Sequence, residues 1–322
     1  MRPTRMRPRP LRTALALAAC VVLGSLAGAA ALPGPAGAAV GTGTSTGTGR
    51  ATVTVGSSLP LLADGAPPAV VAHRGASSLA PENTIAAQEI ARRSGAGFIE
   101  NDVRLSQDGV PHLMHDATVD RTTDGTGAIA TLSSAQLHSL DAGSWFAPVF
   151  AGTRVPTLTE QLADLRTRGG NLLLEIKRAD DIQQVAAIID IVRVQEMTER
   201  VLIQSFDPQH LRWVRTLAPD IPLGLLRNTL DPDPVAVSEE LRLALYNPAG
   251  TALEKNPGVV DQLHQAGVGV WVWTLDTAEK WDRHTRYGVD GIITNRPGEL
   301  IGFQHPRNTS GVPRTGPAGM PR

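Results

Sequence analysis

The stretch Gly97-Phe98-Ile99-Glu100-Asn101-Asp102-Val103-Arg104-Leu105 is an apolar segment that runs directly into two carboxylates. In a β-strand alternate side chains face the same way, so Glu100 and Asp102 share one face and Asn101 lies on the other. Two carboxylates side by side repel each other unless a cation or several hydrogen-bond donors neutralise them. The stretch therefore predicts a buried strand with an acidic pair at its carboxyl end.

Short apolar segments of the same kind recur along the chain. Eight strand candidates lie at 69–73, 98–103, 172–176, 201–205, 222–226, 243–246, 268–275 and 291–294. Helix-like stretches separate most of them, at 84–94, 181–195, 208–217, 259–266 and 278–287. This alternation predicts an α/β fold, a (β/α)8 TIM barrel rather than an open doubly wound sheet, since no glycine-rich dinucleotide fingerprint follows any strand. Only 4% of the residues are aromatic, so the predicted core is mostly aliphatic, as in buried parallel sheets.

One connection is much longer than the others. About 68 residues separate the second and third strand candidates. They include an extra strand candidate at 110–115, which follows the turn Ser106-Gln107-Asp108-Gly109. Because eight strands are already counted without it, we predict a small inserted subdomain at about 104–156, over the barrel mouth where such enzymes carry function. The barrel itself is predicted to span 69–303.

The two ends of the chain differ from the barrel in composition. Residues 1–38 combine five arginines with an apolar run and end in Ala36-Gly37-Ala38, which predicts a signal peptide and a secreted or extracytoplasmic protein. Residues 39–68 are rich in Gly, Thr, Ser and Ala and predict a flexible leader. The proline-rich residues 304–322 predict a disordered tail.

Removing the signal peptide changes the charge and the cysteine count of the protein. Residues 1–38 hold five arginines and no acidic residue, so the formal charge moves from -1 to -6. An acidic protein without a basic run is a poor candidate for binding nucleic acid or for obligate membrane association. Cys20 is the only cysteine, so the mature chain is predicted to fold without disulfides.

The charged residues near the predicted strand ends have a common chemistry. The candidates are His73, Arg74, Glu100, Asp102, His115, Glu175, Lys177 and Trp273. Each has an ordinary structural explanation by itself, such as an ion pair between Glu175 and Lys177. Charges inside a barrel are costly unless they are paired or bound to a metal, and three converging carboxylates predict Mg2+ or Ca2+. With two histidines and an arginine, the set indicates metal-assisted chemistry on a phosphate.

Several short motifs follow one another in a specific order. They are His73-Arg74-Gly75, Pro81-Glu82-Asn83-Thr84, Glu100-Asn101-Asp102, Asp108-Gly109-Val110-Pro111, His115-Asp116, Asp120-Arg121-Thr122-Thr123-Asp124-Gly125-Thr126-Gly127, Leu174-Glu175-Ile176-Lys177, Gln204-Ser205-Phe206-Asp207-Pro208, Trp273-Thr274-Leu275 and Gly288-Val289-Asp290-Gly291-Ile292-Ile293-Thr294-Asn295-Arg296-Pro297. With these motifs the chain resembles the glycerophosphodiester phosphodiesterase family, in its secreted bacterial type, from about residue 69 to 303. It departs from the family at Asn101, usually apolar, and at Asp276, often Asn.

The resemblance implies metal-dependent hydrolysis of a glycerophosphodiester to sn-glycerol 3-phosphate and an alcohol. It implies that His73 and His115 are the catalytic acid and base. It also implies one divalent cation, Ca2+ or Mg2+, on three carboxylates, and a phosphate clamp of two basic side chains. The metal ligands would be Glu100, Asp102 and Glu175, and the clamp Arg74 and Lys177. Trp273 is expected to form an apolar wall of the substrate pocket.

Other functions remain open at this point. One alternative is a lipid phosphodiesterase that resembles sphingomyelinase D or a lysophospholipase D, and another is an inactive exported binding module. The residues do not decide which histidine is the acid, or whether water or a substrate hydroxyl attacks the phosphate. The insertion with its Asp-Arg-Thr-Thr motif favours the enzyme that acts on a small substrate.

Overall fold

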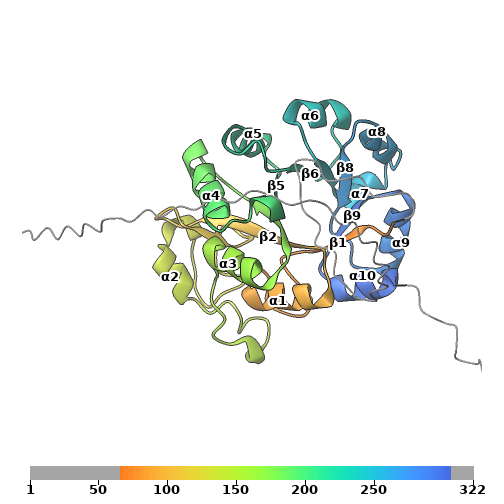
Figure 1. The fold of residues 1–322 in the computed structure, drawn as a ribbon. Coiled ribbons are helices and arrows are strands. Elements are labelled where there is room, and N and C mark those ends of the chain that lie inside the picture. Colours follow the sequence, from red (N-terminus) through yellow and green to blue (C-terminus); the bar gives the residue numbers. More distant parts are fainter. Residues whose placement is uncertain (1–65, 306–322) are drawn as a thin grey trace, which may run out of the picture. The chain divides into compact units, whose positions relative to one another are not determined.

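The computed structural model describes residues 66–305, and they form a closed barrel of eight parallel strands (Figure 1). The strands are β1 (Ala69–Ala72), β2 (Phe98–Leu105), β4 (Asn171–Ile176), β5 (Val201–Ser205), β6 (Leu223–Arg227), β7 (Leu245–Pro248), β8 (Gly269–Val272) and β9 (Gly291–Thr294). Each strand pairs with the next one along the chain, and β9 pairs with β1 to close the barrel. The predicted (β/α)8 fold is confirmed.

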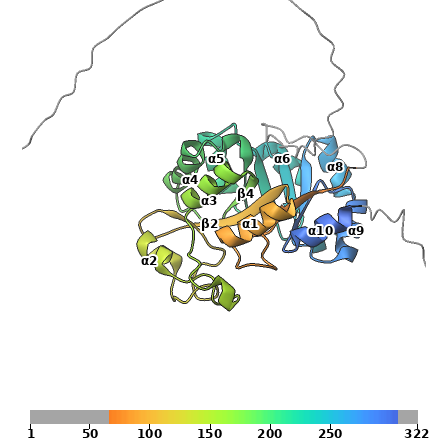
Figure 2. The same ribbon diagram turned by 60° about the horizontal axis from the view of Figure 1, so that its bottom comes forward.

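Helices connect the strands and cover the outside of the barrel (Figure 2). They are α1 (Ile85–Ser94), α3 (Leu158–Arg168), α4 (Ile182–Val194), α5 (Pro208–Leu217), α6 (Pro234–Leu241), α7 (Gly250–Leu253), α8 (Val259–Gln265), α9 (Ala278–Arg286) and α10 (Pro297–Gln304). Thr or Asp side chains cap many of their first turns, as Thr84 caps α1 and Asp181 caps α4. Such a cap satisfies a backbone N–H group that the helix itself leaves without a partner.

Two apolar layers hold the barrel together. One lies between the strands and the helices and is mostly aliphatic, as predicted from the composition. The other fills the inside of the barrel with Val71, Phe98, Leu173, Leu202, Leu245, Trp271 and Ile293. Because side chains two residues apart on a strand share a face, the next inward layer consists of His73, Glu100, Glu175, Gln204, Asn247, Trp273 and Asn295. The apolar layer thus forms the floor beneath a mostly polar one.

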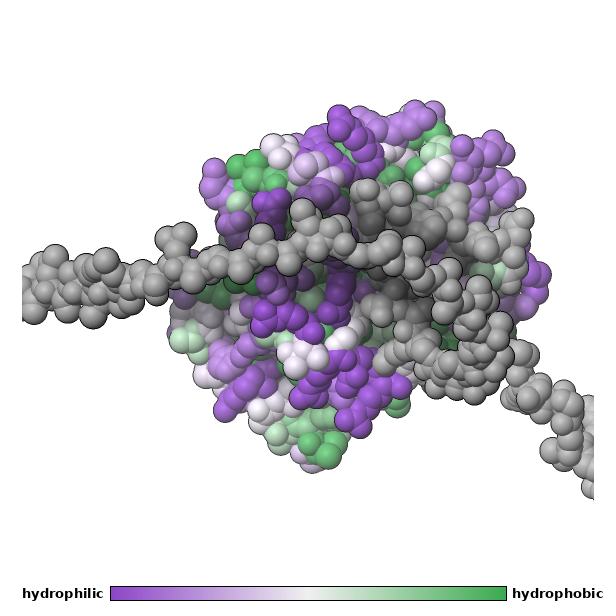
Figure 3. Space-filling model, in the orientation of Figure 1, coloured by the Kyte–Doolittle hydropathy of each residue, from purple (hydrophilic) through white to green (hydrophobic). Residues whose placement is uncertain are grey.

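The segment between β2 and α3 forms a small unit beside the barrel (Figure 1). It contains β3 (Pro111–Leu113), α2 (Ser134–Ser139) and the short helices η1 (Ile129–Thr131) and η2 (Pro148–Phe150). Its own small core consists of Met114, Val119, Ile129, Leu137, Ala142 and Val155. Near η2, Trp145 and Val149 are exposed, and the space-filling view shows hydrophobic surface over this unit (Figure 3).

The acidic pair does not lie at a strand end, contrary to our expectation. β2 continues to Leu105, three residues beyond Asp102, because its last residues pair antiparallel with β3. The parallel part of the ladder ends earlier, where Asp102 is the partner of Glu175 and Val103 that of Ile176. Glu100 and Asp102 therefore lie inside a long strand, but at the level where its neighbours end.

Some predictions concern residues before 66 or after 305, which the structure does not describe. None of the helices among the described residues is long and apolar enough to span a bilayer. The predicted signal peptide, nearly all of the leader and the residues from 306 onward lie outside the described residues. Gln304, which we assigned to the tail, is the last residue of α10, and its side chain donates a 2.8 Å hydrogen bond to Pro68 O.

Candidate active site

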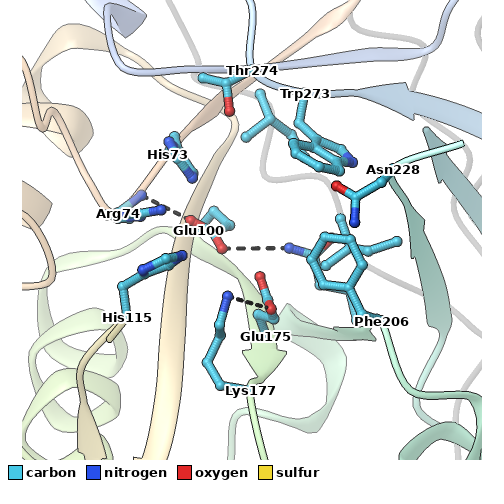
Figure 4. A pocket seen from close by; sticks show the side chains of 13 residues that line it. His73, Arg74, Glu100, His115, Glu175, Lys177, Phe206, Asn228, Trp273 and Thr274 are labelled. Atoms are coloured by element: carbon cyan, nitrogen blue, oxygen red, sulfur yellow. Dashed lines mark hydrogen bonds and ion pairs between the residues drawn. The ribbon is translucent and has the colours of Figure 1, made fainter. Parts of the chain in front are cut away.

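A cavity of about 250 Å³ lies at the carboxyl ends of the barrel strands (Figure 4). It is lined by His73, Arg74, Glu100, His115, Glu175, Lys177, Gln204, Phe206, Leu226, Asn228, Trp273, Thr274 and Ile293. All the predicted site residues except Asp102 are in this lining. Asp102 is only 1% exposed and contacts Arg74 and Lys177 of the lining. The structure therefore brings the predicted residues together at one place.

Three buried carboxylates converge beside the cavity. Glu100, Asp102 and Glu175 each offer an oxygen within 4.8 Å of the oxygens of the other two. The strand register explains this proximity, because Asp102 and Glu175 are direct partners in the ladder between β2 and β4. Glu100 lies two residues before Asp102 and faces the same side.

Two cations lie against the carboxylates. Lys177 Nζ is 2.8 Å from Glu175 Oε1 and 3.4 Å from Asp102 Oδ1, and Arg74 Nε is 3.2 Å from Asp102 Oδ2. Lys177, predicted for the phosphate clamp, thus also forms ion pairs with two of the acids. Three carboxylates and two basic groups still leave one negative charge in excess.

The three acids titrate differently because their surroundings differ. Burial, and then the charge of Asp102, raises the pKa of Glu175 to about 7. Burial and the neighbouring carboxylates also raise the pKa of Glu100 well above its usual value. Burial acts in the same direction on Asp102, but Arg74 and Lys177 outweigh it and lower the pKa of this carboxyl. A further positive charge is needed to keep all three groups ionised at neutral pH.

The carboxylate cluster fits a divalent cation. Asp102 Oδ1 is buried, and apart from its 3.4 Å ion pair with Lys177 it accepts no hydrogen bond from any described residue. Hard cations such as Mg2+ and Ca2+ take carboxylate oxygens as ligands, and a divalent charge offsets the negative excess. Glu100, Asp102 and Glu175 could thus hold such an ion.

The loop after β1 has an unusual backbone that serves this cluster. Arg74 has a φ of 57°, in the left-handed region that side chains rarely adopt. In this conformation its backbone N–H donates a 2.8 Å hydrogen bond to Glu100 Oε2. Asn83 is also left-handed, and its amide donates to Asp102 Oδ2 at 2.8 Å and accepts from Asp102 N at 3.1 Å. Residues of the β1–α1 connection therefore hold two of the three carboxylates.

His73 is oriented by two side chains, Asn295 and Asp276, that were not among the predicted site residues. Its Nδ1 lies 2.7 Å from Asn295 Oδ1. Asn295 Nδ2 donates to Asp276 Oδ2 at 2.6 Å, so the amide turns its oxygen towards the histidine. Burial, and then the charge of Arg74, lowers the pKa of His73 to about 4, so its ring is neutral at pH 7. Because Asn295 Oδ1 can only accept, we assign the proton of the neutral ring to Nδ1.

His115 has a charged partner instead. Its Nδ1 lies 2.6 Å from Asp116 Oδ1. The backbone carbonyl of His115 accepts a 2.8 Å hydrogen bond from Arg104 Nε, which ties the end of the extra strand to β2. His112, three residues earlier, is fully buried and binds Ser134 Oγ at 2.8 Å. His112 is therefore a structural residue, whereas His115 faces the cavity (Figure 4).

The opposite wall of the cavity is largely apolar (Figure 4). The rings of Phe206 and Trp273 meet edge to face at 5.5 Å, and Trp273 Nε1 donates to Asn247 O at 2.8 Å. Asn228 adds a polar group to this wall. Phe206 and Asn228 were not among the predicted site residues, because they lie in loops after β5 and β6 where no strand alternation indicates a direction. Gln204 was also missed, although it is the ladder partner of Glu175 and so faces inward.

Comparison with known proteins agrees with this geometry. The model of the glycerophosphoryl diester phosphodiesterase family matches residues 73–299. The glycerophosphodiester phosphodiesterase of Caldanaerobacter subterraneus subsp. tengcongensis is 37% identical over 236 residues, which cover 72% of this chain and 96% of the relative. That of Bacillus subtilis is 31% identical over 244 residues, which cover 70% of this chain and 83% of the relative.

Solved structures show the same fold. An Oleispira antarctica phosphodiesterase in complex with the product sn-glycerol-3-phosphate matches with a TM-score of 0.70 and 29% identity, over 74% of this chain and 96% of that chain. A glycerophosphodiester phosphodiesterase from Agrobacterium tumefaciens matches with a TM-score of 0.65 and 32% identity, over 73% of this chain and 99% of that chain. The chain therefore belongs to the glycerophosphoryl diester phosphodiesterase family, whose members are phosphoric diester hydrolases.

Proposed function

We propose that this protein hydrolyses glycerophosphodiesters to sn-glycerol 3-phosphate and an alcohol, with a divalent cation and two histidines. The observation that carries the proposal is a single cavity that joins two histidines and two cations to a cluster of buried carboxylates. The product bound to the Oleispira antarctica relative supports the choice of substrate. Ca2+ and Mg2+ both suit the carboxylate ligands.

The hydrogen bonds of the two histidines support different roles for them. His73 carries its proton on Nδ1 and is neutral, so Nε2 has a free lone pair and can act as the base. His115 instead has the charged carboxylate of Asp116 at Nδ1. We propose His115 as the acid. The assignment follows from the partners, an amide for His73 and a carboxylate for His115.

In the proposed reaction two protons move: one leaves the attacking hydroxyl, and one is given to the leaving oxygen on the other side of the phosphorus atom. His73 takes the proton of the attacking hydroxyl, whether from water or from the neighbouring glycerol hydroxyl, as the new P–O bond forms. The bond to the head-group oxygen breaks, and His115 gives its proton to that oxygen so that an alcohol leaves. Attack by the glycerol hydroxyl would give a cyclic phosphate, which water must then open to form sn-glycerol 3-phosphate.

The basic residues neutralise the phosphate during this exchange. The guanidinium of Arg74 suits a bidentate contact to phosphate oxygens, and Lys177 supplies a point charge on the same side. A divalent cation on Glu100, Asp102 and Glu175 would supply Lewis-acid charge stabilisation when bound. Phe206 and Trp273 would contact the carbon atoms of the substrate.

The test is the release of sn-glycerol 3-phosphate from glycerophosphocholine. We expect chelation to abolish the release and Mg2+ or Ca2+ to restore it. His73→Ala and His115→Ala should each lower kcat by at least about 10²-fold, since a general acid or base typically contributes 10²–10⁴-fold. His138→Ala is the matched control, because this exposed histidine of α2 lies outside the cavity. Full activity after exhaustive chelation would refute the metal role.

The same assay separates the other candidate functions. Faster turnover of sphingomyelin or lysophosphatidylcholine than of glycerophosphocholine would favour a lipid phosphodiesterase. Binding of glycerophosphodiesters without turnover would favour an inactive binding module. The cavity of about 250 Å³ supports the small substrate.

We propose in addition that the protein is exported after cleavage behind Ala38. The basic start, the apolar run and the small residues at 36–38 support this proposal. Expression of the full chain in a bacterial host, with mass measurement of the protein outside the cytoplasm, would test it. Recovery of the uncleaved chain in the cytoplasm alone would contradict it.

A further inference from the structure

An ion-pair network connects the inserted segment to the loop after β1. It runs from Arg74 through Glu82, Arg121 and Asp116 to His115. Arg74 NH1 is 2.8 Å from Glu82 Oε1, and His115 Nδ1 is 2.6 Å from Asp116 Oδ1. Both ends of the network line the cavity, whereas the three residues between them do not. The network therefore links Arg74 and His115, two residues of the proposed catalytic machinery, through residues outside the cavity lining.

Arg121 is the central member and uses all three nitrogen atoms of its guanidinium. NH1 and NH2 donate to the two oxygens of Glu82, each at 2.8 Å, and Nε donates to Asp116 Oδ2 at 2.6 Å. The planar, forked guanidinium can serve two carboxylates in this way, which the ammonium of lysine cannot reproduce. Arg121 belongs to the Asp-Arg-Thr-Thr motif, to which the proposed reaction assigns no role.

The carboxylates of the network are ionised. The hydrogen bond from Arg121 is the largest cause that lowers the pKa of Asp116. Burial opposes the shift at Glu82, but the hydrogen bond from Arg121 and the charge of Arg74 outweigh it and lower the pKa of that carboxyl. Asp116 thus presents a negative charge to His115, as a proton donor requires.

The two ends of the network depend on Arg121 to different degrees. Arg74 is held directly by Glu82 and by Asp102, and its backbone binds Glu100. The ring of His115 has Asp116 as its one hydrogen-bond partner among the described residues. Asp116 in turn is fixed by Arg121. Loss of Arg121 should therefore disturb His115 more than Arg74.

We propose that Arg121 is a positioning residue for the reaction: anchored on Glu82, it holds Asp116 and thereby aims His115 at the leaving oxygen. The inference rests on the proposed function, in which His115 protonates the departing alcohol. It predicts that Arg121 contributes more to kcat for substrates whose leaving group must be protonated than for substrates whose leaving group departs as a stable anion. A poor leaving group such as choline must be protonated as the P–O bond breaks, whereas 4-nitrophenolate leaves as a stable anion.

The experiment compares two substrates, glycerophosphocholine and glycerol 3-(4-nitrophenyl phosphate), with the same metal-loaded enzyme. Arg121→Ala should lower kcat by about 10- to 100-fold on the choline ester and by less than about threefold on the nitrophenyl ester. Arg121→Lys should resemble Arg121→Ala, because it keeps the charge but not the fork. Arg154→Ala removes another exposed arginine of the inserted segment, which donates to Ser139 O, and should leave both rates within about twofold.

A merely structural role would give a different result. Partial unfolding lowers kcat equally for both substrates, so equal losses, or a full rescue by Arg121→Lys, would overturn the proposal. His115→Ala is measured in parallel on both substrates. If it shows no dependence on the leaving group, the acid assignment fails, and if the unmodified enzyme releases no sn-glycerol 3-phosphate, the proposed function itself fails. Selective loss in His115→Ala but not in Arg121→Ala would refute the positioning role alone.

Discussion

Asp102 and Glu175 are partners across two strands, yet burial and neighbouring charges shift the pKa values of their carboxyls in opposite directions. Asp102 has both Arg74 and Lys177 beside it, and these cations keep it ionised. Glu175 shares Lys177 but lies against the charge of Asp102, and Glu100 is buried beside the charges of both other acids. The site thus holds one firmly ionised carboxylate and two that bind protons readily. A divalent cation competes with those protons.

This competition makes metal affinity depend on pH. Glu175, with a pKa of about 7, is protonated at lower pH and must lose its proton before it can bind the cation. Affinity should therefore rise by at least about tenfold per pH unit below pH 7, and less steeply above it, because Glu100 must also lose any proton that it holds. Calorimetric titration with Mg2+ or Ca2+ at pH 6, 7 and 8, in buffers of different ionisation enthalpy, measures both affinity and proton release. Equal affinity at pH 6 and pH 8 would contradict this account.

At the scale of elements, the alternation of side chains along each strand places the residues of the candidate site directly above the apolar core. The apolar side chains of the inner layer and the functional ones two residues later belong to the same strands, so the barrel cannot form its core without aligning its site. The outer faces pack on helices, and there Asn101, one of the two departures from the family, donates a hydrogen bond to Gln161 of α3. An amide at this buried position is tolerated because its partner lies on the helix.

The β1–α1 connection depends on close contact between elements at Gly75. A Cβ there would lie 2.7 Å from the backbone carbon of Ala87 on α1, and Gly75 has a φ of 83°. Gly75→Ala should therefore destabilise the fold by more than the roughly 1–2 kcal/mol that a left-handed backbone costs. It should also lower activity, because relief of the clash with α1 displaces the loop that carries Arg74. Gly109→Ala is the control, since Gly109 has a φ of 78° but open space around it.

Denaturant unfolding of both glycine variants gives the two free energies of unfolding. The excess for Gly75→Ala measures the contact with α1, because the backbone cost is common to both variants. Equal destabilisation of the two variants would show that this contact contributes nothing.

At the scale of the whole molecule, a closed barrel and one long connection supply different parts of the site. The barrel strands and their loops supply His73, Arg74 and the carboxylates, and the inserted segment supplies His115. The carboxylates come from β2 and β4, which are adjacent in the barrel but separated by the entire inserted segment in the chain. Their mutual repulsion is a cost to the folded state as a whole, so a bound cation should stabilise the whole fold.

Thermal unfolding should show this stabilisation. At a metal concentration of about 100 times Kd the gain is about 2.7 kcal/mol, or a rise in Tm of about 5–10 °C. Glu175→Gln should lose most of that rise, because it removes one charged ligand while its amide oxygen can still accept from Lys177. A metal-dependent rise of the same size in Glu175→Gln would contradict the assignment of Glu175 as a ligand.

The sequence by itself determined the barrel and most of the site. Strand and helix periods are local, so eight apolar segments and the helices between them could be recognised without any tertiary contact. The period of two on each strand likewise predicted that Glu100 and Asp102 share one face of their strand, as Glu175 and Lys177 do on theirs. What local pattern could not reach was the identity of the partners, such as Arg121 for Asp116, and the direction of loop residues such as Phe206.

Only the tertiary structure decided how His73 is protonated. Its partner Asn295 is 222 residues away in the sequence and arrives because β9 pairs with β1 when the barrel closes. Asp276, after β8, then turns the amide so that its oxygen faces the histidine. Two histidines that are alike in the sequence thus acquire different partners, an amide and a carboxylate. The physical reason is that a proton is placed by the groups around it in space, and barrel closure selects those groups.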